Sequence, residues 1–151
     1  MTFAARRPAA GTRDAADGYR LDDQVGYLLR RASQRHLAIF AARIPELTPT
    51  QFAALARLNQ MGPLSQNLLG RETSMDASTI KGVIDRLAAR GLVATDPDPE
   101  DRRRLVVSLT EAGRALFAGL AAEALAISEE TLAPLTAAER RQFLSLLRKL
   151  A

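Results

Sequence analysis

DRRRLVVSLT, residues 101–110, is the stretch that decides the fold class of this chain. Its second half is rich in apolar and β-branched residues and predicts a short strand over residues 104–109. Its first half sets three arginines side by side at a turn, although like charges repel at close range. Such a cluster suits a polyanionic partner better than it suits stability. The alternative is a solvated cluster, balanced by the neighbouring acidic residues.

A second strand is predicted just upstream, at Leu92-Val93-Ala94. Between the two strands lies a polar segment, residues 96–103, that is interrupted by Pro97 and Pro99. This composition predicts a hairpin tip. Asp101 is expected to pair with one of the adjacent arginines and to hold the shape of the loop.

Three helices are predicted before the hairpin. Thr48-Pro49-Thr50-Gln51 reads as an N-cap, a proline at the first helical position and a capping box, and the helix it opens stops at Gly62-Pro63. A short helix follows over residues 65–72. Asp76 can cap the third helix, which Gly91 closes and whose apolar stripe is formed by Ile80, Val83, Ile84 and Leu87.

Longer helices flank this module. Apolar residues at spacings of three and four predict a helix from residue 21 that ends before Pro45. Thr110 begins a second long helix, Pro134 breaks it, and a capping box at Thr136 opens a final helix to Leu150. Residues 1–20 show no period and are predicted to be a flexible N-terminal arm, either a solvated tail or an arm that touches DNA.

Composition excludes several classes of function. The chain has no cysteine and one histidine, so disulfides, thiol redox sensing and thiolate metal sites are excluded, and no metal or cofactor is expected. No nucleophile elbow or phosphate loop accompanies that histidine, and we do not expect an enzyme. Neither a signal peptide nor a membrane-spanning run is visible, which predicts a cytoplasmic protein without membrane contact. The net charge of +4 comes almost entirely from arginine, which matches phosphate oxygens and guanine edges.

The fold class predicted is mainly α with a small two-stranded β-wing. A winged helix-turn-helix module, residues 48–110, is inserted between long helices. The third helix of such a module lies in the major groove of duplex DNA, and the wing arginines suit the negative minor groove. An ordinary amphipathic surface helix is the alternative. The residues expected to contact DNA are Ser65, Ala77, Ser78, Thr79, Lys81, Arg86, Asp101, Arg102, Arg103 and Arg104.

The same motifs resemble those of the MarR family of bacterial transcriptional regulators. Residues 101–110 resemble its wing signature, Asp-x-Arg followed by Leu-Thr, and Glu111-Ala112-Gly113 continues it. Residues 78–80, 84–87 and 90–93 resemble its recognition helix and the exit from that helix, and residues 47–52 the start of the helix before. The likeness extends from about residue 21 to residue 150. One departure is Gly82, where members of the family often carry a polar or basic residue, so the base readout is left open.

The resemblance implies more than the spacing does. It implies a homodimer joined through the outer helices, residues 21–47 and 111–151, that binds a pseudo-palindromic operator as a repressor. It also implies release by a small-molecule effector, a small aromatic carboxylate. Over its whole length the chain is similar to the branch of the family that represses nicotinic-acid catabolism and responds to 6-hydroxynicotinic acid. The alternatives are a winged-helix protein-interaction module and an activator without small-molecule control.

A ligand site is predicted on the first long helix. A histidine and arginines beside an aromatic ring suit a flat carboxylate. The predicted ligand contacts are Arg31, Arg35, His36 and Phe40. A hydrogen-bonded core or interface role for His36, with solvated arginines, is the alternative reading.

Overall fold

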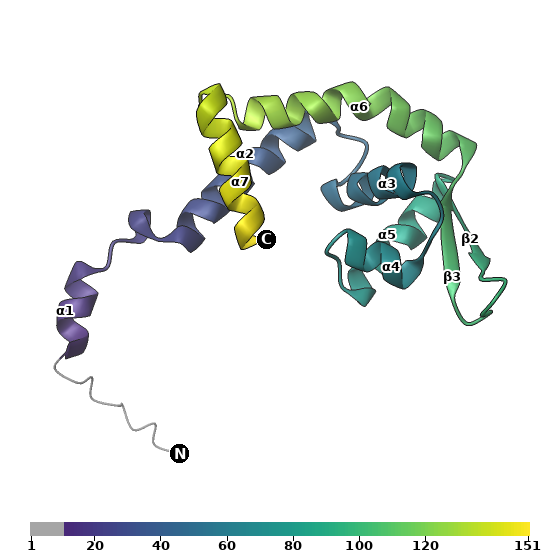
Figure 1. Ribbon diagram of the computed structural model, residues 1–151, viewed down its shortest axis with the longest axis horizontal. Helices are drawn as coiled ribbons and strands as arrows, with labels where there is room; N and C mark the ends of the chain where they lie inside the picture. The colour runs from purple at the N-terminus through teal and green to yellow at the C-terminus, as the bar shows by residue number, and fades with distance from the viewer. Residues whose placement is uncertain (1–10) are drawn as a thin grey trace, which may run out of the picture. The chain divides into compact units, whose positions relative to one another are not determined.

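The structure is a computed structural model that describes residues 11–151 (Figure 1). The chain divides into two compact units, Met1–Arg35 and His36–Ala151. The first unit contains α1 (Gly11–Gly18), the 3₁₀ helix η1 (Leu21–Asp23) and the start of α2 (Val25–Arg43).

Part of the predicted arm is helical. Residues 11–18 form α1, and the long helix begins at Val25 rather than at residue 21. Residues 15–18 of this short helix are all exposed, so they add nothing to an apolar core. The rest of the predicted arm, residues 1–10, lies outside the described residues.

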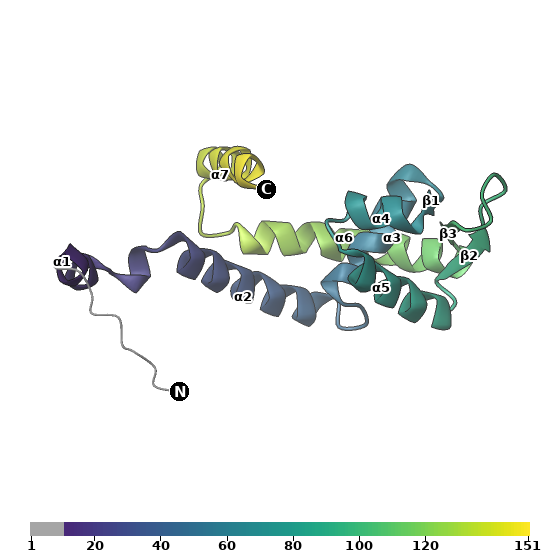
Figure 2. The same cartoon turned by 90° about the horizontal axis from the view of Figure 1, so that it is seen from below.

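The second unit gathers three short helices into a module, seen on one side of Figures 1 and 2. These are α3 (Pro49–Met61), α4 (Gln66–Glu72) and α5 (Ala77–Ala89). The predicted capping box is confirmed, because the Gln51 N–H donates to Thr48 Oγ1 at 3.2 Å and the Thr48 N–H donates to Gln51 Oε1 at 3.1 Å.

The two strands predicted for the wing are present, and a third, short strand that was not predicted completes the sheet of this module. The hairpin strands β2 (Val93–Pro97) and β3 (Leu105–Leu109) are joined by β1 (Leu64–Ser65), in the antiparallel order β1-β3-β2. Leu64 pairs with Val107. β1 has two residues and shows no alternation, so its sequence carries no strand signal, and only the pairing with β3 defines it.

The last two helices are α6 (Glu111–Thr131) and α7 (Ala137–Leu150). Arg43, at the end of α2, bonds to α6 through Nε to Glu130 Oε2 at 2.8 Å and through Nη1 to Glu123 Oε2 at 3.0 Å. These bonds raise the pKa of Arg43 above its ordinary value, and the bond to Glu130 is the largest cause. The guanidinium thus links the end of α2 to α6.

One apolar core joins the module to α6. Its largest fully buried side chains come from the residue just after α2, from α3 to α5 and from β3. They are Ile44, Leu55, Leu69, Ile80, Ile84, Leu87 and Val107. Because several elements share this core, the position of α5 relative to β3 is fixed by close packing.

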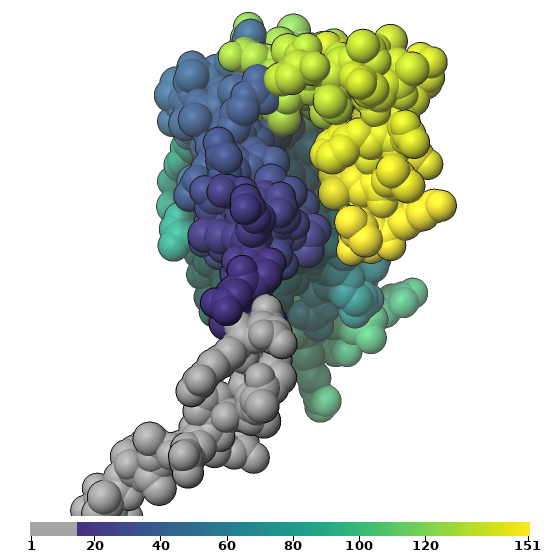
Figure 3. Space-filling model, turned by 90° about the vertical axis from the view of Figure 1, so that its left-hand side faces the viewer, coloured from purple at the N-terminus to yellow at the C-terminus, as the bar shows by residue number. Residues whose placement is uncertain are grey.

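α7 contributes nothing to that core. None of its residues is buried, and Phe143, Leu146 and Leu150 are 42%, 50% and 75% exposed on one side of the helix. Figure 3 shows α7, in yellow, at the surface along its length. An apolar stripe of this kind is ordinarily covered by a partner. Within residues 11–151, no helix combines the length and the apolar character needed to span a bilayer.

The Thr110 hydroxyl links the start of α6 to the backbone just before β2. Thr110 Oγ1 accepts the Gly113 N–H at 3.0 Å and its hydroxyl donates to the Gly91 carbonyl at 2.6 Å. We expect Thr110→Ala to lower the free energy of unfolding by about 1–2 kcal/mol and Tm by roughly 2–8 °C, because a cap and a bonded carbonyl are both lost. Circular dichroism during thermal unfolding measures this. Thr110→Ser keeps the hydroxyl and should retain most of the stability, whereas a wild-type Tm for the alanine variant would show that the cap contributes nothing.

Candidate nucleic-acid interface

α5 presents the predicted polar face to solvent. Ile80, Val83, Ile84 and Leu87 are buried in the core, as their spacing predicted. The exposed residues on the other side include all five of the DNA contacts predicted on this helix: Ala77, Ser78, Thr79, Lys81 and Arg86. The geometry therefore leaves a whole side of α5 available to a partner.

The start of α5 is capped by an acidic side chain. Asp76 Oδ1 accepts the Thr79 N–H at 2.7 Å, and this bond is the main reason why the pKa of Asp76 lies below its ordinary value. A carboxylate already occupies the positive end of the helix. Contacts with a phosphate at this end would therefore fall to the hydroxyls of Ser78 and Thr79.

The two cations further along α5, Lys81 and Arg86, are not equally available to bind an anion. Lys81 Nζ lies 2.7 Å from Asp85 Oδ2, and both side chains are well exposed. The Arg86 guanidinium has no hydrogen-bond or ion-pair partner within the described part of the chain. The pair at positions i and i+4 is a common helical arrangement. It was missed at the sequence level, although its spacing is a sufficient signal.

The hairpin tip is shaped by Asp101, as predicted. Asp101 Oδ1 accepts the Arg103 N–H at 3.1 Å, and Asp101 Oδ2 lies 3.7 Å from Arg104 Nε. The Arg104 N–H also donates to the Asp101 carbonyl at 2.9 Å, closing the turn. Arg102 and Arg103 are exposed, and their guanidinium groups have no partner among residues 11–151. The tip of the wing thus carries two guanidinium groups that are available to bind an anion.

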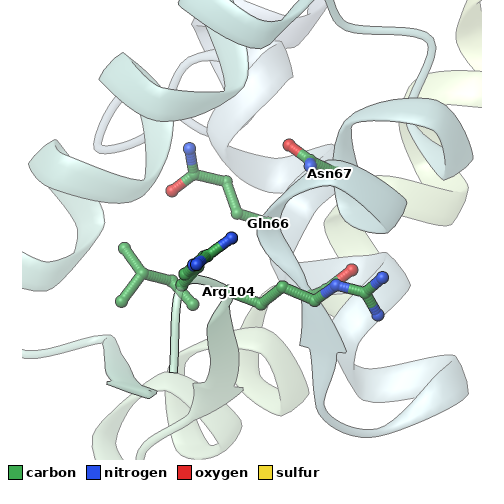
Figure 4. Close-up of a pocket in the computed structure, with 6 residues that line it drawn as sticks. Gln66, Asn67 and Arg104 are labelled. Carbon is green, nitrogen blue, oxygen red and sulfur yellow. The ribbon is translucent and has the colours of Figure 1, made fainter. Parts of the chain in front are cut away.

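A shallow cavity of about 130 Å³ lies where the wing meets α4. Figure 4 shows Gln66 and Asn67 at the start of α4 and Arg104 on the wing side of this cavity. Ser65 also lines it, but its Oγ accepts the Leu68 N–H at 3.2 Å and so caps α4. Gln66 and Asn67 were not predicted as contacts. Only the pairing of β1 with β3 places them beside the arginines, and that pairing has no sequence signal.

The predicted ligand residues fall in both units. Arg31 lies in the first unit, with its guanidinium carbon 5.8 Å from the centre of the Tyr27 ring, and Arg35 is also exposed there. His36 belongs to the second unit and is half-buried, with Nδ1 2.9 Å from Thr131 Oγ1 of α6. This bond fits the alternative reading of His36 as a hydrogen-bonded residue, and equally leaves Nε2 for a ligand.

Phe40 is buried in the core of the second unit. Its ring meets that of Phe52 edge-on, with the centroids 6.1 Å apart, and Phe52 lies 5.5 Å from Phe117. A role for Phe40 against a ligand stays a prediction. In the described part of the chain no three His, Asp or Glu side chains are grouped so that they could bind a metal ion.

Three helices, a basic two-stranded wing and an exposed third helix define a winged helix-turn-helix protein of the DNA-binding class. Residues 47–105 match the model of the MarR family. The chain is 47% identical over 134 residues to the HTH-type transcriptional repressor NicR of Pseudomonas putida, across 87% of this chain and 85% of the relative. The chain belongs to the MarR family and is a transcriptional repressor of the NicR type, not an enzyme.

Solved structures agree with this assignment. A probable transcriptional regulator from Pseudomonas aeruginosa is 53% identical with a TM-score of 0.86, over 87% of this chain and all (100%) of that one. BpsR of Bordetella bronchiseptica, whose DNA binding is regulated by 6-hydroxynicotinic acid, is 45% identical with a TM-score of 0.85, over 87% of this chain and 96% of BpsR. The predicted family, the mainly helical fold and the class of function are confirmed.

Proposed function

We propose that this chain is a ligand-responsive repressor that binds a pseudo-palindromic operator as a homodimer and leaves it when a small aromatic acid binds. The observation that carries the proposal is the joint exposure of α5 and of the unpaired Arg102 and Arg103 on one module, whose spacing a shared core fixes. A helix suits the major groove, and guanidinium groups suit the adjacent minor groove.

The dimer is supported by the apolar surface that the single chain leaves open. Phe143, Leu146 and Leu150 form such a surface on α7, and Leu28 and Leu29 on α2 of the first unit are 49% and 48% exposed. A second copy would cover these residues and remove them from water. Two copies would then present two α5 helices to half-sites about 10 bp apart.

Selection from a library of random duplexes, followed by gel shift and light scattering, tests the proposal. We expect a two-fold symmetric consensus, and two chains for each bound duplex. A chain that selects no sequence, or that binds as one copy, would contradict the proposal. Release of the duplex is expected to require only the ligand. We propose no metal or cofactor.

The effector we propose is 6-hydroxynicotinic acid, on the strength of the 45% identity to BpsR. Such a ligand releases DNA only if it binds one conformation of the repressor better than the other. His36 is the residue of the second unit best suited to its carboxylate, because Nδ1 is engaged by Thr131 and Nε2 remains for a second bond. Arg31 and Arg35 are proposed as further contacts.

His36→Ala is expected to raise the concentration of 6-hydroxynicotinic acid needed for release by about tenfold or more, through the loss of a charge-assisted hydrogen bond. Affinity for the selected duplex without ligand should not change. Fluorescence anisotropy of labelled duplex, titrated with the ligand, measures both. His36→Gln retains a hydrogen-bonding partner for Thr131 and controls for a purely structural role. Identical release by wild type and His36→Ala would place the ligand elsewhere.

A further inference from the structure

Gly82 lies in the middle of α5, a helix of 13 residues. Glycine is the least favourable helix residue after proline, because the unfolded chain loses more freedom there than at any other residue. A glycine at such a place ordinarily has a packing reason or a functional one.

The packing of this chain does not require a glycine at position 82. A Cβ added there would meet only the flexible end of Arg86, with Nη1 at 3.5 Å, which is ordinary contact. At Gly70, by contrast, an added Cβ would lie 3.1 Å from both Ile80 Cγ2 and the Met75 carbonyl oxygen. At Gly113 it would lie 2.0 Å from the carbonyl oxygen of Leu92. These two glycines are explained by the fold, and Gly82 is not.

The position of Gly82 on α5 indicates a functional reason for the glycine. Ser78, Gly82 and Arg86 are spaced by four residues and so form one row along α5, in which Ser78 and Arg86 are exposed and Gly82 is half-buried. On the neighbouring row the Lys81 ammonium is paired with Asp85 at 2.7 Å. Arg86 is therefore the cation of this side without a partner within residues 11–151, and its guanidinium lies over the bare backbone of Gly82.

We propose that Gly82 is the point of closest approach between α5 and a base pair, and that Gly82 and Arg86 together determine which sequence the chain selects. Without a Cβ the helix backbone can approach the base edges more closely. The planar guanidinium one turn further on then donates to O6 and N7 of a guanine in the same groove. Gly82 acts as a positioning residue and Arg86 as the reader. The inference rests on the proposed function.

The test compares wild type, Gly82→Ala, Arg86→Ala and the control Gly119→Ala. Gly119 is an exposed glycine within α6, outside the module, where an added Cβ meets nothing within 4 Å. Each protein is titrated against the duplex that wild type selects from a random library and against the unselected library, and each repeats the selection. Light scattering confirms that all four have the same mass.

We expect Gly82→Ala to raise Tm by about 2–4 °C, as a helix-favouring change, and still to weaken binding to the selected duplex by about tenfold or more. Binding to the unselected library should not change. Gly119→Ala should raise Tm without weakening either interaction. Arg86→Ala should select sequences in which one guanine of each half-site is no longer required.

Two results would overturn the inference. One is unchanged affinity of Gly82→Ala for the selected duplex, and the other is equal weakening on both kinds of DNA, which would mean a general docking role. A wild-type chain that selects no sequence would instead refute the proposed function, so the two failures are distinct.

Discussion

Replacing Arg102 and Arg103 together by alanine is expected to weaken binding to the selected duplex by at least about 1,000-fold. Each arginine inserted into a groove contributes about 1–3 kcal/mol, and a dimer carries two wings. The slope of affinity against salt concentration should fall by about one for each arginine removed. Gel shift across a series of salt concentrations measures both quantities.

The fold should not be affected by this double change. Both side chains are exposed, and the shape of the tip depends on the Asp101 carboxylate, which accepts the backbone N–H of residue 103 and lies near Arg104. Circular dichroism should therefore give a wild-type Tm. A lower Tm would mean that the two arginines stabilise the fold of the wing, and that their role is not limited to binding DNA.

A matched control removes two arginines per chain from α7, outside the wing. Arg141 and Arg148 are exposed on α7, on the side opposite the stripe of Phe143, Leu146 and Leu150. The double variant Arg141→Ala/Arg148→Ala should bind nearly as wild type does. If both double variants weaken binding equally, the wing contributes only to net charge, and its insertion into a groove is refuted.

Gly113→Ala is expected to give the largest loss of stability of the changes considered, about 3 kcal/mol, with a fall in Tm of roughly 6–12 °C. An added Cβ would lie 2.0 Å from the carbonyl oxygen of Leu92 and 3.3 Å from Leu109 Cδ2. The carbonyl belongs to the backbone just before β2 and also accepts the Thr110 N–H at 3.1 Å. It cannot move without breaking the junction between the sheet and α6.

Gly119→Ala in the same helix is the matched control, because nothing lies within 4 Å of the added atom. It should raise Tm slightly. Thermal unfolding of both variants at equal concentration makes the comparison. A Gly113→Ala protein as stable as wild type would show that α6 can shift along the sheet, and would contradict the fixed placement of the wing.

Sequence patterns predicted those features that depend on neighbouring residues. The caps at Thr48, Asp76 and Thr136 and the buried stripe of α5 are local, so spacing and residue type specify them. The turn at Asp101 was found for the same reason. Gly113 was noted as part of a family motif, but the contact with Leu92 that requires it became visible only in the fold.

Features that depend on distant residues could not be predicted. β1 exists only because Leu64 pairs with Val107, and that pairing also places Gln66 and Asn67 beside the wing. The bond between His36 and Thr131 joins residues that are 95 positions apart. Patterns of residue spacing along one segment do not contain such contacts, because tertiary packing decides them.

The central claim is that two copies of the module each insert a wing beside a major-groove helix. Hydroxyl-radical cleavage of the selected duplex, bound by wild type and by Arg102→Ala/Arg103→Ala, tests it most directly. We predict protected sugars in two symmetric sets around one dyad, and loss of only the outermost protection in the variant. Protection on one side of the duplex alone, or an outer pattern that persists without the two arginines, would contradict the account.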